Sequence, residues 1–366
     1  MGQIKIAILS YAYKGINPHG SSVYVQNLLK ILSRFKSIII DFYCPYPNFE
    51  FKKIKNINYI YIPIIKVPLL RYLSYSYRTA KRVNKKKYDI IHSNNGAGLF
   101  LSNLDFETFH HNEPFSPKSI FRWLNYQSLR INLHKTRQII AVSEQARKEL
   151  IKIEKINEKK IIIINNSIDC EKYNTQINNS ELEHKFKESN DEKILLYVGL
   201  LVPRKRPTLA IDTLDYILTR NYSACLIIIG TGPMYNFLIR YTKKRNLEHE
   251  VSFLGNVLDV APFYKMADIL LVPSEHEGFG FPYLEGPACG TKFIGFDTGI
   301  ATIAANADLG IIAQNTNDFK KKALDYIINN QKLNKSHFEF ILRNFSLKHF
   351  EKRILKIYFN YFNLKR

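Results

Sequence analysis

Two glutamates, eight positions apart and on either side of a glycine-containing loop, are the strongest candidates for a functional site in this sequence. Glu277 stands in the loop EGFGF, which follows an apolar run at 269–272, and Glu285 comes after Pro282. Proline suits the first turn of a helix, where its missing N–H group does no harm. We therefore predict a buried strand, a loop, and a helix that begins at Pro282 and carries Glu285 about one turn in.

The start of such a helix favours an anion, most often a phosphate, because its first N–H groups are free and its dipole is positive there. Two carboxylates would repel a phosphate. Glu277 and Glu285 are better suited to accept hydrogen bonds from hydroxyl groups on either side of it. A phosphate between two polyols describes a nucleotide sugar, with its ribose, diphosphate and hexose.

A second candidate site is the cationic cluster Arg204, Lys205 and Arg206, which follows a predicted strand that ends at Gly199. Three cations in a loop at the end of a strand can neutralise a diphosphate. The alternative is a solvated run of charge, which is common in so basic a chain. The position directly after a strand favours the diphosphate interpretation.

Several other kinds of site are excluded. Gly230-Thr231-Gly232 follows a predicted strand, but Tyr235 replaces the third glycine of a dinucleotide fingerprint. The sequence has no cysteine pair, HExxH motif or acidic triad, so no metal is expected, and it has no GxSxG elbow. The four scattered cysteines indicate reduced thiols in a cytosolic protein.

The elements that must position these residues alternate between short apolar runs and helical spacing, as in a doubly wound sheet. The strands predicted in the first half are 5–9, 37–43, 57–62, 88–92, 105–109, 138–142 and 160–164. The polar segment 171–190 is typical of a linker or surface crossover. The strands predicted after it are 194–199, 224–229, 251–254, 269–272 and 292–296. A chain of 366 residues suits two such domains.

Further candidates lie in the first half of the chain. Gly20 and Ser21 stand at the predicted start of a helix, where they either meet a phosphate or simply cap the helix. His110 follows the predicted strand 105–109. A lone histidine is more often structural, but ligands of open α/β sheets bind beyond the carboxyl ends of the strands. That position favours a functional role for His110.

The net charge is +21, of which the first 190 residues carry +15. Such an excess favours an anionic partner, which is an acidic glycan, an anionic membrane leaflet or a nucleic acid. Lys, Ile and Asn are abundant throughout, which weakens any argument from charge. Only the charge supports a nucleic-acid partner, so no nucleic-acid partner is expected.

The segment from Lys66 to Lys87 is aromatic, basic and helical in its spacing. Its apolar positions share one face, and the favoured interpretation is that this face packs on the core. The alternative is an interfacial helix on an anionic membrane surface. No apolar run has the length of a transmembrane helix, and the N-terminus lacks a signal-peptide pattern. We expect a cytoplasmic protein, which in the membrane alternative is peripheral on the inner face of the cytoplasmic membrane.

The chain resembles the retaining group 1 glycosyltransferases (family 4) of the GT-B fold along nearly its whole length. The most specific match is EGFGFPYLEGPACGT at 277–291, which is similar to the family's EGFG…LEAMACGTP. Supporting matches follow the family's order: AVSE at 141–144, NSID at 166–169, GTGP at 230–233, FLGNV at 253–257 and AD at 267–268.

The resemblance implies an α/β, GT-B architecture of two Rossmann-like, doubly wound domains that face a central cleft. We expect an acceptor-binding domain over 1–175, a nucleotide-sugar-binding domain over 190–345, and a C-terminal helix over 346–366 that packs back toward the N-terminal domain. The implied substrates are a nucleotide sugar, with a UDP-sugar favoured, and a glycan or lipid-linked acceptor of surface polysaccharide or lipopolysaccharide biosynthesis. No cofactor and no metal are implied.

The resemblance also implies roles for single residues. Glu277 looks like the glutamate that holds the donor hexose, and Glu285 like the one that binds the ribose hydroxyls. Lys205 matches the lysine on the diphosphate, and His110 matches the histidine near the leaving group. His110, Lys205 and Glu277 are the catalytic candidates. The other donor-binding positions are Gly20, Ser21, Arg204, Arg206, Gly278, Phe279, Gly280 and Phe281.

Two positions depart from the family's pattern. Leu200 stands where the family has an arginine after the glycine of the second domain's first loop, which leaves Arg204 or Arg206 to replace its charge. Ile303 stands in place of the glutamate of the family's GGxxE motif. Both departures concern the donor. They motivate the alternative of a GT-B-like binding or partner subunit without turnover.

Overall fold

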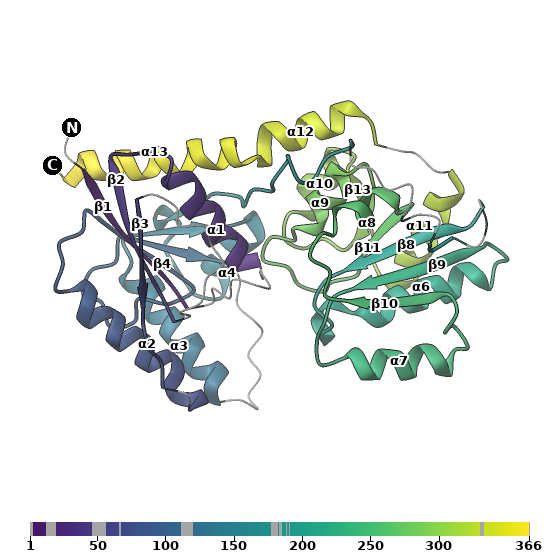
Figure 1. Cartoon of the computed structure of the whole chain (residues 1–366), viewed down its shortest axis with the longest axis horizontal. Helices are drawn as coiled ribbons and strands as arrows, with labels where there is room; N and C mark the ends of the chain where they lie inside the picture. The colour runs from purple at the N-terminus through teal and green to yellow at the C-terminus, as the bar shows by residue number, and fades with distance from the viewer. Residues whose placement is uncertain are drawn as a thin grey trace. The chain divides into compact units, whose positions relative to one another are not determined.

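The computed structural model describes residues 3–11, 20–45, 56–65, 67–110, 120–176, 182, 185–187, 189, 191–329 and 333–365. The chain divides into two compact units. The first unit is formed by Met1–Ser167 together with Leu347–Arg366, and the second by Ile168–Ser346. Each unit holds a parallel sheet packed by helices, so the prediction of two Rossmann-like α/β domains is confirmed (Figure 1).

In the described part of the first unit, seven strands pair in parallel in the order β3-β2-β1-β4-β5-β6-β7. Their bounds are β1 (Ile4–Ser10), β2 (Ile38–Cys44), β3 (Ile57–Tyr61), β4 (Ile90–Asn94), β5 (Phe106–Phe109), β6 (Gln138–Ala141) and β7 (Ile161–Ile163). Every strand predicted for this half is present, with ends that differ by at most two residues.

The helices of the first unit are α1 (Gly20–Leu32), α2 (Pro68–Val83), α3 (Ile120–Lys135), α4 (Glu144–Lys152), the short η1 (Glu158–Lys160) and α13 (Leu347–Lys365). Ser143 caps α4, because its Oγ accepts a hydrogen bond from the Ala146 N–H group at 3.1 Å. α13 packs against α1 and buries Phe350, Ile354 and Tyr358. Among the described helices, none combines the length and the apolar character needed to cross a bilayer.

In the described part of the second unit, six parallel strands follow the order β10-β9-β8-β11-β12-β13. Their bounds are β8 (Lys193–Val198), β9 (Ala224–Ile229), β10 (Val251–Gly255), β11 (Ile269–Val272), β12 (Phe293–Gly295) and β13 (Gly310–Ile312). The helices are η2 (Pro203–Lys205), α6 (Pro207–Leu218), α7 (Tyr235–Lys244), α8 (Ala261–Met266), α9 (Pro282–Ala288), α10 (Ala301–Asn306), α11 (Thr316–Asn329) and α12 (Lys335–Phe345). The edge strand β13 was not predicted, since three residues carry too little periodicity.

The strand order brings two predicted clusters to one edge of the second sheet. The chain moves outward from β8 through β9 to β10 and returns to the other side of β8 at β11. Ligands of open α/β sheets bind beyond the carboxyl ends of the strands at such a switch point. The loop with Arg204 to Arg206 follows β8, and the loop with Glu277 follows β11. The fold therefore positions both clusters where a ligand is expected.

The two glycines of the Gly230-Thr231-Gly232 motif allow two backbones to touch. A Cβ atom at Gly230 would overlap the carbonyl oxygen of Gly199, and one at Gly232 would lie 2.5 Å from the carbonyl oxygen of Leu201. The Leu201 N–H group donates to the Thr231 carbonyl oxygen at 2.9 Å. The motif thus packs the loop after β9 against the loop after β8, and this packing accounts for its glycines.

Replacing Gly230 with Ala is expected to lower the melting temperature by several degrees, because backbone atoms cannot move aside cheaply for the new Cβ. Gly255→Ala is the matched control. Gly255 also has a positive φ, of 63°, but a Cβ there would have no atom within 4 Å. In the control, the free energy of unfolding should fall only by the cost of a left-handed backbone conformation, about 1–2 kcal/mol. Thermal unfolding of both variants measures the difference, and equal losses would contradict the packing role of Gly230.

Candidate active site

The loops that follow β8 and β11 are joined at the switch point of the second sheet. The Glu275 N–H group donates to the carbonyl oxygen of Arg204 at 2.9 Å. Beside this bond, the Lys205 ammonium forms an ion pair and hydrogen bond with Oε1 of Glu277. The structure therefore brings together two residues that were predicted separately, from loops that are 72 positions apart in the sequence.

The ion pair of Lys205 and Glu277 is largely buried, with side chains that are 15% and 7% exposed. Burial by itself raises the pKa of Glu277, but the charge and hydrogen bond of Lys205, with help from Ser274 and Arg204, hold that pKa below its ordinary value of 4.5. Glu277 is therefore ionised at neutral pH. An ionised, buried carboxylate is a strong acceptor for hydroxyl groups.

Arg204 lies next to this ion pair. Its Nη1 donates to the carbonyl oxygen of His276 at 3.3 Å, and its charge helps to lower the pKa of Glu277. Leu200, the position that lacks the family's arginine, lies four residues earlier and accepts a hydrogen bond from the Tyr197 hydroxyl through its carbonyl oxygen at 3.0 Å. Arg204 is thus a second cation near Glu277, beside Lys205.

Arg206 is turned toward a different part of the unit. Its Nη2 donates to Oγ1 of Thr316 at 2.9 Å, at the start of α11, and its guanidinium lies over the Phe296 ring, 5.3 Å from the centroid. Its Nε also lies 3.5 Å from a carboxylate oxygen of Glu275. The structure therefore separates Arg206 from the pair of Lys205 and Glu277, although the three cations are consecutive in the sequence.

The loop from Glu277 to Phe281 is held by contacts with Gly299 and Ile300. The Ile300 N–H group donates to the carbonyl oxygen of Phe279 at 3.0 Å. A Cβ atom at Gly299, which has a φ of 60°, would overlap that same carbonyl. Gly280 also has a positive φ, of 86°. Glycine at these two positions allows the loop to follow a path that other residues resist.

The helix that follows this loop differs from the expected phosphate site. α9 does begin at Pro282, as predicted. However, the N–H groups of Tyr283 and Leu284 donate to the carbonyl oxygens of Gly280 and Phe281 at 3.1 and 2.9 Å. The prediction of free N–H groups is wrong for these two positions, because the tight turn before the helix uses them. These two N–H groups are therefore already engaged within the turn.

Glu285 lies in the first turn of α9 and is held by two tyrosines. The Tyr264 hydroxyl donates to Oε2 at 2.9 Å, and Tyr173 also hydrogen bonds with this carboxylate. Burial raises the pKa of Glu285, while the two tyrosines and the charge of Lys172 oppose the rise. The two rings meet edge to face, with centroids 6.1 Å apart. Neither tyrosine was predicted to contact Glu285, since no motif marks them among the 23 tyrosines of the sequence.

The candidates of the first unit are placed as follows. His110 comes directly after β5 and is 6% exposed, with the ring of Tyr24 edge-on at a centroid distance of 5.1 Å. Gly20 and Ser21 open α1, as predicted. The loop before them, 12–19, lies outside the described residues. The approach of Gly20 and Ser21 to a phosphate therefore stays a prediction.

A buried chain of hydrogen bonds supports the ring that contacts His110. The Thr108 hydroxyl donates to the Tyr24 hydroxyl at 3.0 Å and also pairs with Nε2 of His92 at 2.6 Å. The Tyr358 hydroxyl from α13 pairs with Nδ1 of His92. Burial lowers the pKa of His92 to about 3, so this histidine is neutral. The chain ties α1, β4, β5 and α13 together around the end of β5.

No group of three His, Cys, Asp or Glu side chains among the described residues is arranged to hold a metal ion. The charges gathered at the switch point of the second unit are instead those of Lys205, Arg204 and Glu277. Such a set can bind an anion and hydroxyl groups side by side.

Two family models match the chain. The model described as glycosyl transferases group 1 matches residues 178–338. The model described as glycosyltransferase family 4 matches residues 18–172. The two matches follow each other along the chain, and each falls mainly in one of the two units.

Similar proteins include an uncharacterised glycosyltransferase of Methanocaldococcus jannaschii, 27% identical over 349 residues that cover 91% of each chain. The UDP-Gal:alpha-D-GlcNAc-diphosphoundecaprenol alpha-1,3-galactosyltransferase of Escherichia coli is 25% identical over 58% of this chain and 59% of its own. Among solved structures, the sucrose-phosphate synthase of Thermosynechococcus elongatus superposes with a TM-score of 0.80 at 19% identity, over 99% of this chain and 100% of its own. The structural neighbours have the GT-B fold, which confirms that prediction.

Replacing Lys205 with Met is expected to leave Glu277 as a buried carboxylate without its ion-pair partner, at a cost of about 3–5 kcal/mol at neutral pH. In the wild type, the lowered pKa of Glu277 gives stability that is present above the unfolded-state pKa and is lost as the pH falls through the folded-state pKa. In the variant, the pKa should lie above its unfolded-state value, so the stability deficit should shrink as the pH falls toward about 4.

Melting temperatures of the wild type and Lys205→Met at pH 4.5 and 7.5 measure this difference. Arg343→Met is the control, because its pair with Glu339 is exposed and contributes little. A deficit that is equal at both pH values, or no larger than that of the control, would show that Lys205 does not hold the charge of Glu277.

Proposed function

Since the chain belongs to the group 1 glycosyltransferases of the family 4 type, we propose that it moves a hexose from a nucleotide sugar to a glycan or lipid-linked acceptor. We propose that the transfer retains the anomeric configuration and needs no divalent metal. The observation that carries this proposal is the buried pair of Lys205 and Glu277 at the switch point of the second sheet.

The proposed chemistry follows from charge. When the anomeric bond breaks, negative charge develops on the diphosphate and positive charge on the sugar. Lys205 and Arg204 stabilise the leaving diphosphate, in the place that a divalent cation takes in other enzymes. Glu277, kept ionised by Lys205, accepts hydrogen bonds from the hexose hydroxyls. With retention, the acceptor attacks from the face that the nucleotide leaves.

Glu277 is not proposed as a nucleophile. Two-step hydrolysis by a carboxylate pair needs both carboxylates at the anomeric carbon, about 5 Å apart. Glu285 has a different role in the proposal, in which it binds the ribose hydroxyls. The hydroxyls of Tyr264 and Tyr173 orient its carboxylate for that role. The role of Glu285 is therefore nucleotide binding, and that of Glu277 is sugar recognition.

The first unit supplies the acceptor side in this proposal. His110 contacts the sugar's primary hydroxyl and the leaving group, and the Tyr24 ring limits the positions that its imidazole can take. Gly20 and Ser21 approach the phosphate from the start of α1. Gly278, Phe279, Gly280 and Phe281 form the loop beside the donor.

A UDP-sugar is the favoured donor, and a lipid-linked glycan of a surface polysaccharide or lipopolysaccharide pathway is the favoured acceptor. The name of the Escherichia coli relative includes both a UDP-sugar and a diphosphoundecaprenol acceptor, which supports this choice. A non-catalytic binding or partner subunit is the second candidate. It is favoured by the apolar side chains of Leu200 and Ile303 at two positions where the family has charged residues.

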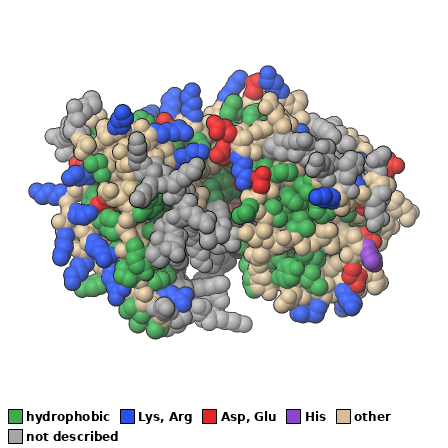
Figure 2. Space-filling view, in the orientation of Figure 1, with side chains coloured by type: hydrophobic (Ala, Val, Ile, Leu, Met, Phe, Trp, Pro, Cys, Tyr) green, Lys and Arg blue, Asp and Glu red, His purple; other side chains and the backbone are tan. Residues whose placement is uncertain are grey.

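A membrane-facing role for α2 completes the proposal and agrees with a protein on the inner face of the cytoplasmic membrane. The helix exposes Leu70 and Tyr77, and Phe100 packs its exposed ring against Tyr77 with centroids 6.0 Å apart. Arg71, Lys81 and Arg82 are exposed on the same helix. Figure 2 shows Lys and Arg side chains gathered with hydrophobic ones in the region of α2. Mixed aromatic and basic faces suit an anionic lipid surface.

Incubation with UDP-, GDP- and ADP-sugars should give release of nucleoside diphosphate from at least one donor. Glu277→Gln is expected to reduce turnover by about 10²–10³-fold, since it removes a charge that acts on the reacting sugar. Glu285→Gln should weaken UDP binding by roughly tenfold or more, the effect of one hydrogen bond to a charged group. Glu339→Gln, a change on α12 at a side chain that is 43% exposed, is the control.

Calorimetry with UDP and a nucleotide-release assay measure these effects. Donor binding with no turnover in any form would favour the non-catalytic subunit. Failure of every nucleotide sugar to bind, with Glu285→Gln indistinguishable from the wild type, would remove the proposed function.

Charge reversal on α2 should release the protein from membranes. The wild type is expected to co-sediment with vesicles that contain an anionic lipid and not with neutral vesicles. The variant Arg71→Glu with Lys81→Glu should lose most of this binding, because each basic residue contributes about 1 kcal/mol near such a surface. Lys243→Glu with Lys244→Glu, an equal charge change on exposed positions of α7, is the control. Equal binding to both kinds of vesicle would refute an electrostatic attachment.

A further inference from the structure

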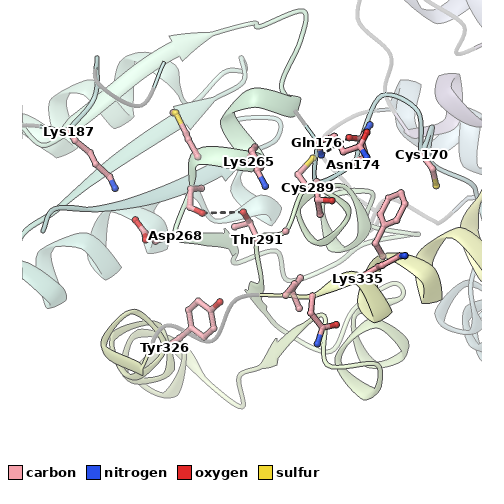
Figure 3. A pocket seen from close by; sticks show the side chains of 17 residues that line it. Cys170, Asn174, Gln176, Lys187, Lys265, Asp268, Cys289, Thr291, Tyr326 and Lys335 are labelled. Carbon is pink, nitrogen blue, oxygen red and sulfur yellow. Dashed lines mark hydrogen bonds between the residues drawn. The ribbon is translucent and has the colours of Figure 1, made fainter. Parts of the chain in front are cut away.

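A cavity of about 770 Å³ lies in the second unit, at the amino ends of β11 and β12 (Figure 3). Asp268, directly before β11, and Thr291, close before β12, both line it. The loop with Glu277 follows the carboxyl end of β11, so the cavity is on the opposite edge of the sheet from the candidate donor site. Its volume falls within the range of small-molecule sites, roughly 300–1,000 Å³.

Positive charge prevails among the described residues that line the cavity. Lys187, Lys265 and Lys335 come from three separate parts of the unit, as Figure 3 shows. The acidic side chain in the lining is Asp268, whose carboxylate accepts a hydrogen bond from the Ile194 N–H group at 2.8 Å. Three ammonium groups against one carboxylate leave the lining with a net positive charge, so the cavity favours an anion.

The rest of the lining adds groups that suit hydroxyls. Thr175, Gln176 and Tyr326 offer hydroxyl and amide groups that can donate and accept hydrogen bonds. Met266 and Phe338 add apolar surface. Cations, amides and a few apolar contacts together fit an anion that also carries hydroxyl groups. We propose that this cavity is a second ligand site, for a small hydroxylated anion of the sugar-phosphate class.

The segment from Cys170 to Gln176, which lines the cavity, also contacts the side chain of Glu285. Cys170, Asn174 and Gln176 line the cavity, and Tyr173 between them hydrogen bonds with the Glu285 carboxylate. A ligand in the cavity therefore contacts the segment that positions this carboxylate. This link rests on the proposed function, in which Glu285 binds the nucleotide, and it makes nucleotide affinity depend on the occupancy of the cavity.

The site is tested on the full chain by calorimetry with glucose 6-phosphate, inorganic phosphate and glucose, in the presence of saturating UDP to fill the candidate donor site. Glucose 6-phosphate should bind more tightly than phosphate, and glucose should not bind. Lys265→Gln should weaken the binding of glucose 6-phosphate at least tenfold. Lys243→Gln, an exposed change on α7 outside the lining, should leave it unchanged.

Two outcomes overturn the second site: no binding of either anion, or equal binding by the wild type and Lys265→Gln. A third variant, Lys205→Gln, separates this proposal from the proposed function. Its binding of glucose 6-phosphate should equal that of the wild type even without UDP, and this result is independent of any nucleotide activity. Loss of the binding in Lys205→Gln would place the anion at the switch point and would also overturn the second site.

The link to Glu285 has its own measurement. UDP affinity should change at least threefold when glucose 6-phosphate is present, and Lys265→Gln should abolish that change. An identical UDP affinity with and without the anion would overturn the link.

Discussion

The buried ion pair between Lys205 and Glu277 is the interaction on which the candidate site depends. Each charge, left alone in the interior, would cost several kcal/mol, and their mutual attraction offsets that cost only while both loops stay in place. The pair therefore couples the loop after β8 to the loop after β11. The backbone hydrogen bond from Glu275 to Arg204 holds the same two loops together. These two contacts fix the position of the loop after β8 relative to the loop after β11.

The same pair also sets the chemistry that is available there. Because Lys205 keeps Glu277 ionised, one carboxylate can accept hydroxyl groups close to a cluster of positive charge. In the proposed reaction, Lys205 lies between the diphosphate and Glu277 and interacts with both. Arg204 adds a second cation, whereas the contacts of Arg206 with Thr316 and Phe296 direct its charge elsewhere. We propose that Arg204, four residues after Leu200, supplies the cation that the family has at that position.

The short helix α9 connects two features of the second unit. Glu285 lies in its first turn, with the tyrosines at 173 and 264, and Cys289, which lines the cavity, directly follows its last turn. The segment from Cys170 to Gln176 contacts both features. Because α9 has only seven residues, a movement at one end also moves the other end. The proposed nucleotide contact and the proposed second site are therefore coupled through this helix.

Local sequence determined the secondary structure and the identity of the principal residues. Apolar runs predicted the strands to within two residues in the first unit, since burial on both faces of a parallel sheet requires such runs. Pro282 predicted the start of α9, and the spacing of Glu277 and Glu285 indicated their loop and helix positions. The short edge strand β13 and the hydrogen-bonded first turn of α9 were missed, because neither leaves a local pattern.

Only the tertiary structure decided which groups meet. The pairing of Lys205 with Glu277, the division between Arg204 and Arg206, and the tyrosines on Glu285 each depend on the order of strands in the sheet. Side chains that are adjacent in sequence, such as the three cations, point to different neighbours once the backbone turns at Arg206, where φ is 48°. Sequence alone determines which charges are present and on which elements they lie. Their partners are decided by burial, which makes an unpaired charge too costly and selects the contacts that the fold can provide.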